Sequence, residues 1–333
     1  MNKYTSVLNR TASSFKLLIL GVTIAMITLM ASGCGSKPDS TLVEGKVNVV
    51  TSFYPLYDFA KNIGGEHVNV INMIPAGIEP HDWTPKSRDI DNASKAQLFL
   101  YNGAGLEGWV DDFLKGLDAG SKPVTVEVSK GIELIHGNPE EAEGHEEGHD
   151  EAASEQHDHG DYDPHTWVSP KSALIMAENI KNSLIEVDAA HKSDYEANYK
   201  VFADKLKQLD EKFASSIASA PRKEIVVSHQ AFGYLCRDYG LTQMPIMGLS
   251  PDAEPRSQDI VNISKFVKDH DVKYIFFEEL VSDTIAKTIA GETGAKTLVL
   301  NPIEGLTGEE EQKGEDYVSL MESNLQNLMK ALQ

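Results

Sequence analysis

The sequence has few cysteines and an excess of acidic over basic residues. Cys34 and Cys236 are its only cysteines, so neither a disulfide framework nor a cysteine-based zinc site is expected. Asp and Glu number 51 against 30 Lys and Arg, which gives a net charge of −21. This charge argues against binding nucleic acid, and against binding anionic lipid surfaces by charge. The His-Glu-x-x-His pattern of many zinc proteases is also absent.

The N-terminal segment has the pattern of a bacterial lipoprotein signal. Three basic residues precede an apolar run of fourteen residues, 17–30, which is too short for a comfortable membrane span. Small residues then precede Cys34. We expect residues 1–33 to be a signal peptide, Cys34 to carry a lipid, and residues 34–46 to be a flexible tether. The alternative is ordinary secretion with a spare cysteine. Removal of the three positive charges takes the net charge from −21 to −24, which is compatible with cation capture.

Strand patterns and helix patterns alternate along the rest of the chain. The expected strands are 47–53, 67–74, 97–101, 124–128, 224–228, 243–247, 272–277 and 296–300. The expected helices begin at 55 and 84, and also cover 108–117, 169–180, 193–218, 230–239, 256–270, 282–293 and 314–332. This alternation on both sides of one long helix predicts an α/β fold of two parallel-sheet lobes. We expect an N-terminal lobe at 47–190, a connecting helix at 191–220 and a C-terminal lobe at 221–333.

A histidine-rich stretch interrupts the first lobe. Residues 136–165 hold six of the eleven histidines and many carboxylates, but no Lys or Arg. Without apolar periodicity, residues 136–163 should form a solvated loop. Imidazole and carboxylate together are ligands for a divalent transition metal, above all zinc. We expect weak, auxiliary metal binding at His136, His145, His149, His157 and His159. The alternative is an acidic loop that only adds solubility.

Four potential ligands follow strands, where open parallel α/β sheets bind their ligands. They are His81, His165, His229 and Glu304, and three imidazoles with one carboxylate make a tetrahedral set suited to zinc. The first two share a phrase, Pro-His-x-Trp followed by a hydroxyl residue and proline. The proline restricts the backbone before each histidine, and the tryptophan can shield and stiffen the site. Thr84 and Ser169 are the expected N-caps of the helices that follow.

Each candidate has a simpler interpretation. A single histidine is more often a surface residue or a hydrogen-bonded core residue than a ligand. The chemistry also leaves the fourth ligand open among Glu304, Glu79, Glu278, Glu279 and water. The remaining histidines, His67, His191 and His270, are expected at the surface without a metal.

The motifs PHDWTPKSRD, DYDPHTWVSP, VVSHQAFGY and LNPIEGLT together resemble the substrate-binding proteins of zinc ABC transporters, of the ZnuA/AdcA type. The resemblance covers nearly all of the chain after the tether. It implies two α/β lobes joined by a rigid long helix, with the metal between them. By matching motifs, His81, His165 and His229 would be the imidazole ligands and Glu304 the carboxylate ligand. Manganese-binding relatives carry a carboxylate where His229 stands, so the histidine favours zinc.

The expected function is therefore capture of Zn²⁺ outside the cytoplasm, as a transported ligand, by a lipid-anchored monomer. The loaded protein would dock on an ABC permease in the cytoplasmic membrane and release zinc there. A site with three histidines and one glutamate has no open position for a substrate, so we expect no enzymatic activity. The long helix should limit the lobes to small rotations. The alternatives are a manganese-binding homologue, a metal-dependent adhesin lipoprotein or a zinc hydrolase.

Overall fold

The computed structural model describes residues 41–117, 120, 123–137, 162–251 and 255–333. All of them belong to one compact unit, Asp39–Gln333. The expected signal peptide, most of the tether with Cys34, and four histidines of the expected loop (His145, His149, His157 and His159) lie outside the described residues. Within the described ranges, no helix is both long and apolar enough to cross a bilayer.

The N-terminal lobe is built on a parallel four-stranded sheet in the order β2-β1-β3-β4. Its strands are β1 (Val47–Thr51), β2 (Val68–Asn72), β3 (Leu98–Tyr101) and β4 (Val124–Glu127). Its helices are α2 (Tyr54–Gly64), α3 (Ser87–Lys95), α4 (Val110–Lys115) and α6 (Pro170–Val187). Successive residues Val49 and Val50 are both fully buried but belong to different hydrophobic clusters. Both faces of the sheet are thus covered, which explains the near-continuous apolar run of this strand.

The C-terminal lobe repeats this architecture with strand order β6-β5-β7-β8, again fully parallel. Its strands are β5 (Glu224–His229), β6 (Thr242–Met247), β7 (Tyr274–Phe277) and β8 (Lys296–Val299). Its helices are α8 (Gly233–Tyr239), α9 (Ser257–Asp269) and α10 (Thr284–Thr293). Val226 and Val227 are buried in two separate clusters, as in the first sheet. The predicted α/β fold of two parallel-sheet lobes is confirmed.

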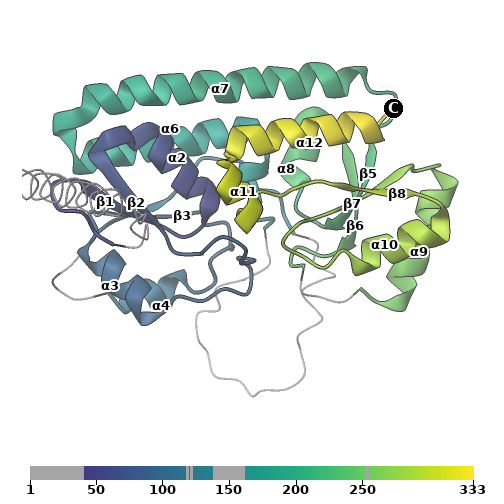
Figure 1. The fold of residues 1–333 in the computed structure, drawn as a ribbon, viewed down its shortest axis with the longest axis horizontal. Helices are drawn as coiled ribbons and strands as arrows, with labels where there is room; N and C mark the ends of the chain where they lie inside the picture. The colour runs from purple at the N-terminus through teal and green to yellow at the C-terminus, as the bar shows by residue number, and fades with distance from the viewer. Residues whose placement is uncertain (1–40, 118–119, 121–122, 138–161, 252–254) are drawn as a thin grey trace, which may run out of the picture. The chain divides into compact units, whose positions relative to one another are not determined.

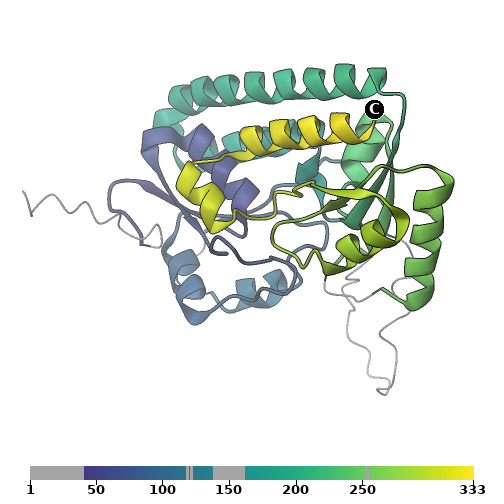
Figure 2. The same cartoon turned by 45° about the vertical axis from the view of Figure 1, so that its right-hand side comes forward.

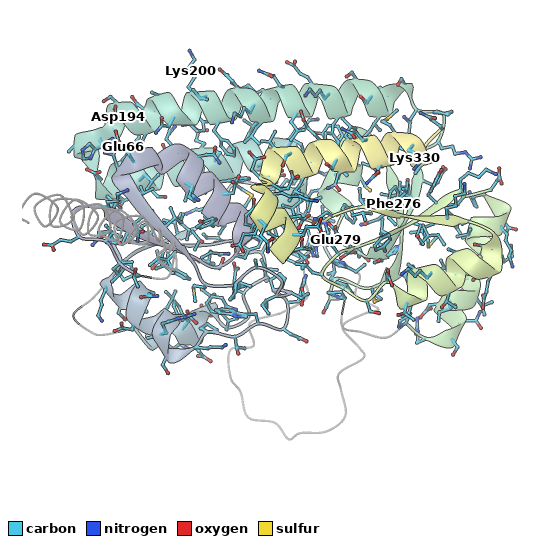
Figure 3. The ribbon with its side chains drawn as sticks, viewed as in Figure 1. Glu66, Asp194, Lys200, Phe276, Glu279 and Lys330 are labelled. Atoms are coloured by element: carbon cyan, nitrogen blue, oxygen red, sulfur yellow. The ribbon has the colours of Figure 1, made fainter. Side chains whose placement is uncertain are left out.

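A single long helix, α7 (Lys192–Ser219), passes both lobes (Figures 1 and 2). Its apolar residues recur at helical spacing and are buried: Tyr195, Phe202, Leu206, Leu209 and Phe213. Lys200 lies on the exposed side and points away from the lobes (Figure 3). One hydrophobic cluster contains residues of α7 and of both sheets. The lobes therefore share a continuous core along this helix, which opposes wide hinge motion.

The last helix, α12 (Tyr317–Ala331), also joins the lobes. The ring of Tyr317 packs edge-on against Phe59 of α2 at a centroid distance of 4.9 Å. Its hydroxyl donates to the carbonyl oxygen of Trp167 at 2.7 Å. The boundaries at 190/191 and 220/221 remain our proposal, and α12 shows that a cut by sequence separates residues that pack together.

Several expected helix starts were wrong. The helix expected from Thr84 begins at Ser87, where the backbone N–H of Lys86 donates to the Asp89 carboxylate at 2.8 Å. The helix expected at 230–239 begins three residues later, at Gly233. The helix expected at 314–332 is preceded by a separate one, α11 (Gly308–Lys313). Gly314 ends α11 in the left-handed conformation (φ 71°), which glycine adopts at no steric cost. Three short 3₁₀ turns were also missed: η1 (Gly65–His67), η3 (Thr166–Val168) and η4 (Ala189–His191).

Candidate metal centre

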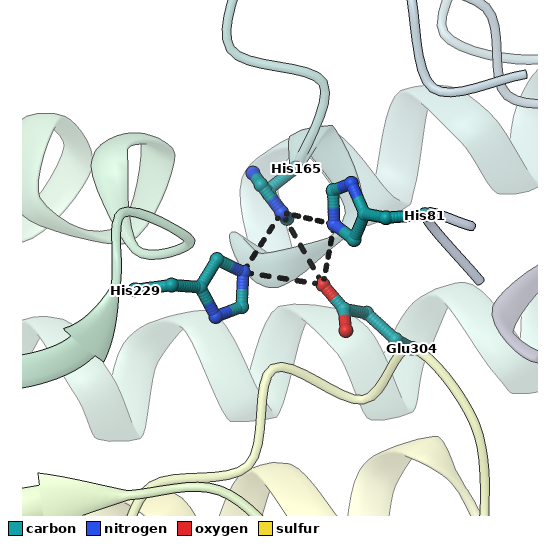
Figure 4. Close-up of side chains that lie close together, drawn as sticks. All are labelled: His81, His165, His229 and Glu304. Atoms are coloured by element: carbon teal, nitrogen blue, oxygen red, sulfur yellow. Dashed lines mark hydrogen bonds and ion pairs between the residues drawn. The ribbon is translucent and has the colours of Figure 1, made fainter. Parts of the chain in front are cut away.

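Four side chains from four loops or strand ends converge between the lobes (Figure 4). His81 comes from the connection between β2 and α3, and His165 precedes η3. His229 is the last residue of β5, and Glu304 follows β8. Each therefore lies beyond or at the carboxyl end of a parallel strand, as the sequence predicted. The structure brings all four sequence-predicted candidates together.

The spacing of the four ligand atoms matches a tetrahedral metal site. His165 Nε2 lies 3.2 Å from His81 Nε2 and 3.2 Å from His229 Nε2. Glu304 Oε1 lies 3.3 Å from the Nε2 of His81, 3.2 Å from that of His165 and 3.4 Å from that of His229. Zinc bonds of about 2.0–2.1 Å at tetrahedral angles separate the ligand atoms by about 3.3 Å. The residues present thus fit a zinc ion without rearrangement.

The candidate centre is almost closed to solvent. His165 and His229 are fully buried, and the side chain of Glu304 is 1% exposed. The side chain of His81 is 11% exposed, so it is the one member of the four with access to water. A buried carboxylate and three buried imidazoles are costly to desolvate without a partner. A divalent cation would supply that partner.

Two buried carboxylates orient the two fully buried imidazoles. Asp163 Oδ1 accepts from His165 Nδ1 at 2.8 Å and from the His165 backbone N–H at 2.9 Å. Glu278 accepts from His229 Nδ1 at 2.7 Å and from the His229 backbone N–H at 3.2 Å. An ionised carboxylate only accepts, so Nδ1 carries the proton and the Nε2 lone pair faces the centre. Such partners raise the basicity of a ligand and fix its orientation.

Sequence reasoning did not identify these two supports. Asp163 was not singled out, although it stands two residues before His165 in Asp-Pro-His. Glu278 was considered only as a possible fourth ligand. The signal was present in its position directly after β7, the strand that pairs with β5 and thus lies beside His229.

Electrostatics couples the four residues strongly. Burial lowers the pKa of His229, but the charges and hydrogen bonds of Glu278 and Glu304 outweigh it, so the pKa is raised well above 6.5. The pKa of His165 is also raised, because its hydrogen bonds with Asp163 and Glu304 outweigh burial. Burial raises the pKa of Glu304, but the three histidines hold it well below its usual range. A metal ion must therefore displace protons from the imidazoles.

The other carboxylates considered for the fourth position have other partners. Glu79 accepts the backbone N–H of His81 at 2.9 and 3.0 Å, and its Oε1 stays 4.0 Å from His81 Nε2. Glu279 accepts from the Asn301 amide at 3.1 Å and lies near α11 (Figure 3). Burial and the charge of Glu310 raise the pKa of Glu279 to about 7. Glu304 alone of these carboxylates has an oxygen within 3.4 Å of all three imidazoles.

The two tryptophans of the repeated phrase have different surroundings. Trp167 is fully buried with its ring 5.4 Å from that of His165, and its Nε1 donates to the carbonyl oxygen of Pro302 at 2.7 Å. It thereby ties the loop of Glu304 to the loop of His165. Trp83 packs edge-on against Trp109 at 5.5 Å, in a separate cluster of the N-terminal lobe.

The backbone on both sides of the centre is held tightly. The Asn102 side chain donates to the carbonyl oxygen of Pro164 and accepts from the Thr166 hydroxyl, both at 2.9 Å. These bonds bracket His165. Ile303 precedes Glu304 with φ 60°, which is rare for a β-branched residue and typical of functional sites. Its N–H donates to Asn301 Oδ1 at 2.7 Å, which stabilises this turn.

The remaining described histidines do not join the centre. His67 and His191 stack at 3.9 Å, and each contacts a carboxylate, Asp194 and Asp188 respectively. His270 is exposed and stacks on Phe266. His136 is exposed and packs against Tyr162 at 4.8 Å. Auxiliary metal binding by His136 and the four histidines outside the described residues stays a prediction.

Comparisons with known proteins agree with this geometry. The family model described as zinc-uptake complex component A, periplasmic (ZnuA), matches residues 49–331. The high-affinity zinc uptake system protein ZnuA of Bacillus subtilis is 41% identical over 312 residues, which cover 93% of this chain and 96% of the relative. The zinc-binding protein AdcA of Streptococcus pyogenes serotype M3 is 40% identical over 300 residues, or 88% of this chain. The match spans only 57% of the length of that relative.

A solved structure shares the fold. The zinc-bound ZnuA-like domain of Streptococcus pneumoniae AdcA superimposes with a TM-score of 0.72 at 37% sequence identity. The alignment covers 86% of this chain and 99% of that domain. The two-lobed architecture of the present chain is thus found in a domain that holds a zinc ion.

Proposed function

The chain belongs to the family of zinc-uptake complex component A proteins, and on this premise we propose that it captures Zn²⁺ outside the cytoplasm for uptake. The names of its relatives support zinc as the transported ion. Because the chain spans little more than half of AdcA, we carry over only the function of the matching part. The receiving partner would be the permease of an ABC transporter.

One observation carries the proposal. The Nε2 atoms of His81, His165 and His229 and the Oε1 atom of Glu304 all lie within 4.8 Å of one another, and the distances given above fall between 3.2 and 3.4 Å. This arrangement comes from four separate loops or strand ends. We infer that these four residues are the zinc ligands.

The donor set favours zinc over manganese. Manganese and other hard ions prefer carboxylate, carbonyl and water oxygens, often six of them, whereas three imidazoles suit zinc. A tetrahedral arrangement of four atoms leaves no room for a larger shell. The candidate centre also leaves no open position of the kind that a catalytic zinc site keeps for water or substrate. We therefore propose a binding function and no enzymatic one.

Capture and release follow from where the ligands originate. His81 and His165 belong to the N-terminal lobe, and His229 and Glu304 to the C-terminal lobe. A bound ion would cross-link the lobes, and a shift of one lobe against the other would pull ligands off it. The shared core along α7 and the bond from Trp167 to Pro302 limit such shifts. We infer that small displacements, imposed by the permease, release the ion.

We further propose that Cys34 anchors the protein to the membrane and that the five auxiliary histidines collect zinc near the tight site. Both proposals concern segments that lie wholly or largely outside the described residues, and they come from the sequence.

The test is a competitive titration of the purified protein against a zinc chelator, with zinc and with manganese. We expect one tight zinc site per chain and far weaker manganese binding. Manganese binding as tight as zinc binding, or no tight zinc site, would contradict the proposal. A strain without the protein should grow poorly only when zinc is scarce. Normal growth under zinc limitation would argue against a role in uptake.

A further inference from the structure

The carboxylate of Asp163 is used unevenly. Its Oδ1 accepts two hydrogen bonds from His165, as described above. Its Oδ2 is buried and makes no hydrogen bond to any residue that the structure describes. A buried unpaired carboxylate oxygen is costly, so something must hold the group in this orientation. Asp163 itself lies next to the proposed ligand but belongs to a loop between two distant segments.

The holding contacts come from the other lobe. Gly233, the first residue of α8, packs directly against Asp163, and a Cβ placed there would lie 2.3 Å from Oδ2. The next residue, Tyr234, is fully buried. Its hydroxyl donates to the Asp163 carbonyl oxygen at 2.7 Å and accepts the N–H of Ile135 at 3.2 Å. The N–H of Asp163 in turn donates to the Ile135 carbonyl oxygen at 2.8 Å. Both the main chain and the side chain of Asp163 are thus fixed by α8.

We propose that Gly233 and Tyr234 are positioning residues for metal binding, which act on the ligand His165 through Asp163. This inference rests on the proposed function. Glycine is required at position 233 because the Asp163 carboxylate occupies the space of a side chain. A larger residue would push the carboxylate away from His165 Nδ1, and the imidazole would lose its orientation.

The same short stretch of the C-terminal lobe therefore serves two ligands. His229 ends β5, and Gly233 begins α8 four residues later. One end of the stretch supplies a ligand, and the other end supports a ligand of the opposite lobe. A displacement of the lobes would move His229 and would also release Asp163. The inference thus links the position of the lobes to the geometry of His165.

The central test is Gly233→Ala, measured by chelator competition with less than one equivalent of zinc so that the tight site fills first. Loss of a carboxylate partner of a ligating histidine typically weakens metal binding about 10- to 100-fold. We expect Asp163→Ala to fall in this range and Gly233→Ala to approach it. Gly291→Ala in α10 is the matched control, because a Cβ at that helical glycine meets nothing within 4 Å. It should bind zinc as tightly as the wild type.

A double variant separates positioning from general damage to the fold. In the Asp163→Ala background the clash is gone, so adding Gly233→Ala should change the affinity by a factor near 1. The visible spectrum of the cobalt-loaded protein should shift in Gly233→Ala and stay unchanged in Gly291→Ala. Tyr234→Phe, which removes only the hydroxyl, should weaken zinc binding in the same direction by a smaller factor.

Wild-type affinity and an unshifted cobalt spectrum in Gly233→Ala would overturn the inference while leaving the proposed function intact. Multiplying losses in the double variant would also overturn it, because the two residues would then act separately. A wild-type protein that binds zinc no more tightly than the His81→Ala variant would overturn the proposed function and this inference together.

Discussion

Replacement of His81 by alanine is the cleanest way to remove one proposed ligand. His81 lies in a connecting loop and is the most exposed of the four residues. It has no buried carboxylate partner like those of His165 and His229, so its removal leaves no buried charge unpaired. We therefore expect the metal-free variant to lose less than about 1 kcal/mol of stability, as for most substitutions outside a core.

The loss of zinc affinity should be much larger. Four-ligand structural zinc sites bind with roughly 10–16 kcal/mol of apparent free energy near pH 7. Shared among four ligands, this is about 2.5–4 kcal/mol for one imidazole, or roughly a 10²- to 10³-fold weaker Kd. With free zinc about 1,000 times above the wild-type Kd, binding stabilises the wild type by about 4.1 kcal/mol. The same zinc concentration should stabilise the variant by only about 0.4–1.4 kcal/mol.

The assay is unfolding of both proteins by denaturant, with buffered zinc and with chelator. The difference between the two conditions isolates the contribution of the metal from that of the fold. An equal zinc-induced stabilisation in both proteins would refute the role of His81 as a ligand. A metal-free variant as destabilised as the wild type is on zinc removal would show that His81 has a structural role instead.

Three further predictions concern pH, a buried acid and the histidine-rich segment. Because the pKa of His229 is raised well above 6.5 in the folded protein, its stabilising effect is full below about pH 6.5 and is lost as pH rises through that pKa. Zinc competes with the same proton, so the zinc-induced rise in Tm should be larger at pH 8 than at pH 6; an equal rise would contradict this. Burial and the charge of Asp316 raise the pKa of Asp58 from 3.8 to about 7, so wild-type stability should fall as pH rises through this window. Asp58→Asn should flatten that fall in thermal unfolding between pH 5 and 8, and an unchanged slope would show that Asp58 is not its source. Deletion of residues 137–160 should leave one tight zinc site in calorimetry and remove only weak binding, and loss of the tight site would refute this division.

The sequence predicted the ligands because local patterns carry them. His229 and Glu304 stand where an apolar strand pattern stops, and the parallel fold brings such positions to one edge. His81 and His165 share a phrase that marks the entry to a helix. The fold class followed from the same alternation, and the long amphipathic helix was predicted within about a residue of its observed ends.

The supports of these ligands could not be predicted in the same way. Asp163 and Gly233 meet across 70 residues of chain, and only the packing of the lobes creates their contact. Nothing local distinguishes Trp167, which packs beside His165, from Trp83, which packs against Trp109. The helix start at Ser87 instead of Thr84 reflects the hydrogen bond between Lys86 and Asp89, a cap that competes with the threonine. Tertiary contacts and cap geometry decided each of these cases.

The central claim is that His81, His165, His229 and Glu304 together hold the zinc ion. A crystal structure of the protein with one equivalent of zinc, measured at the zinc absorption edge, tests it most directly. The account predicts one strong anomalous peak between these residues, about 2.0–2.2 Å from the three Nε2 atoms and from a carboxylate oxygen of Glu304. A strong peak elsewhere, with none between these four side chains, would contradict it.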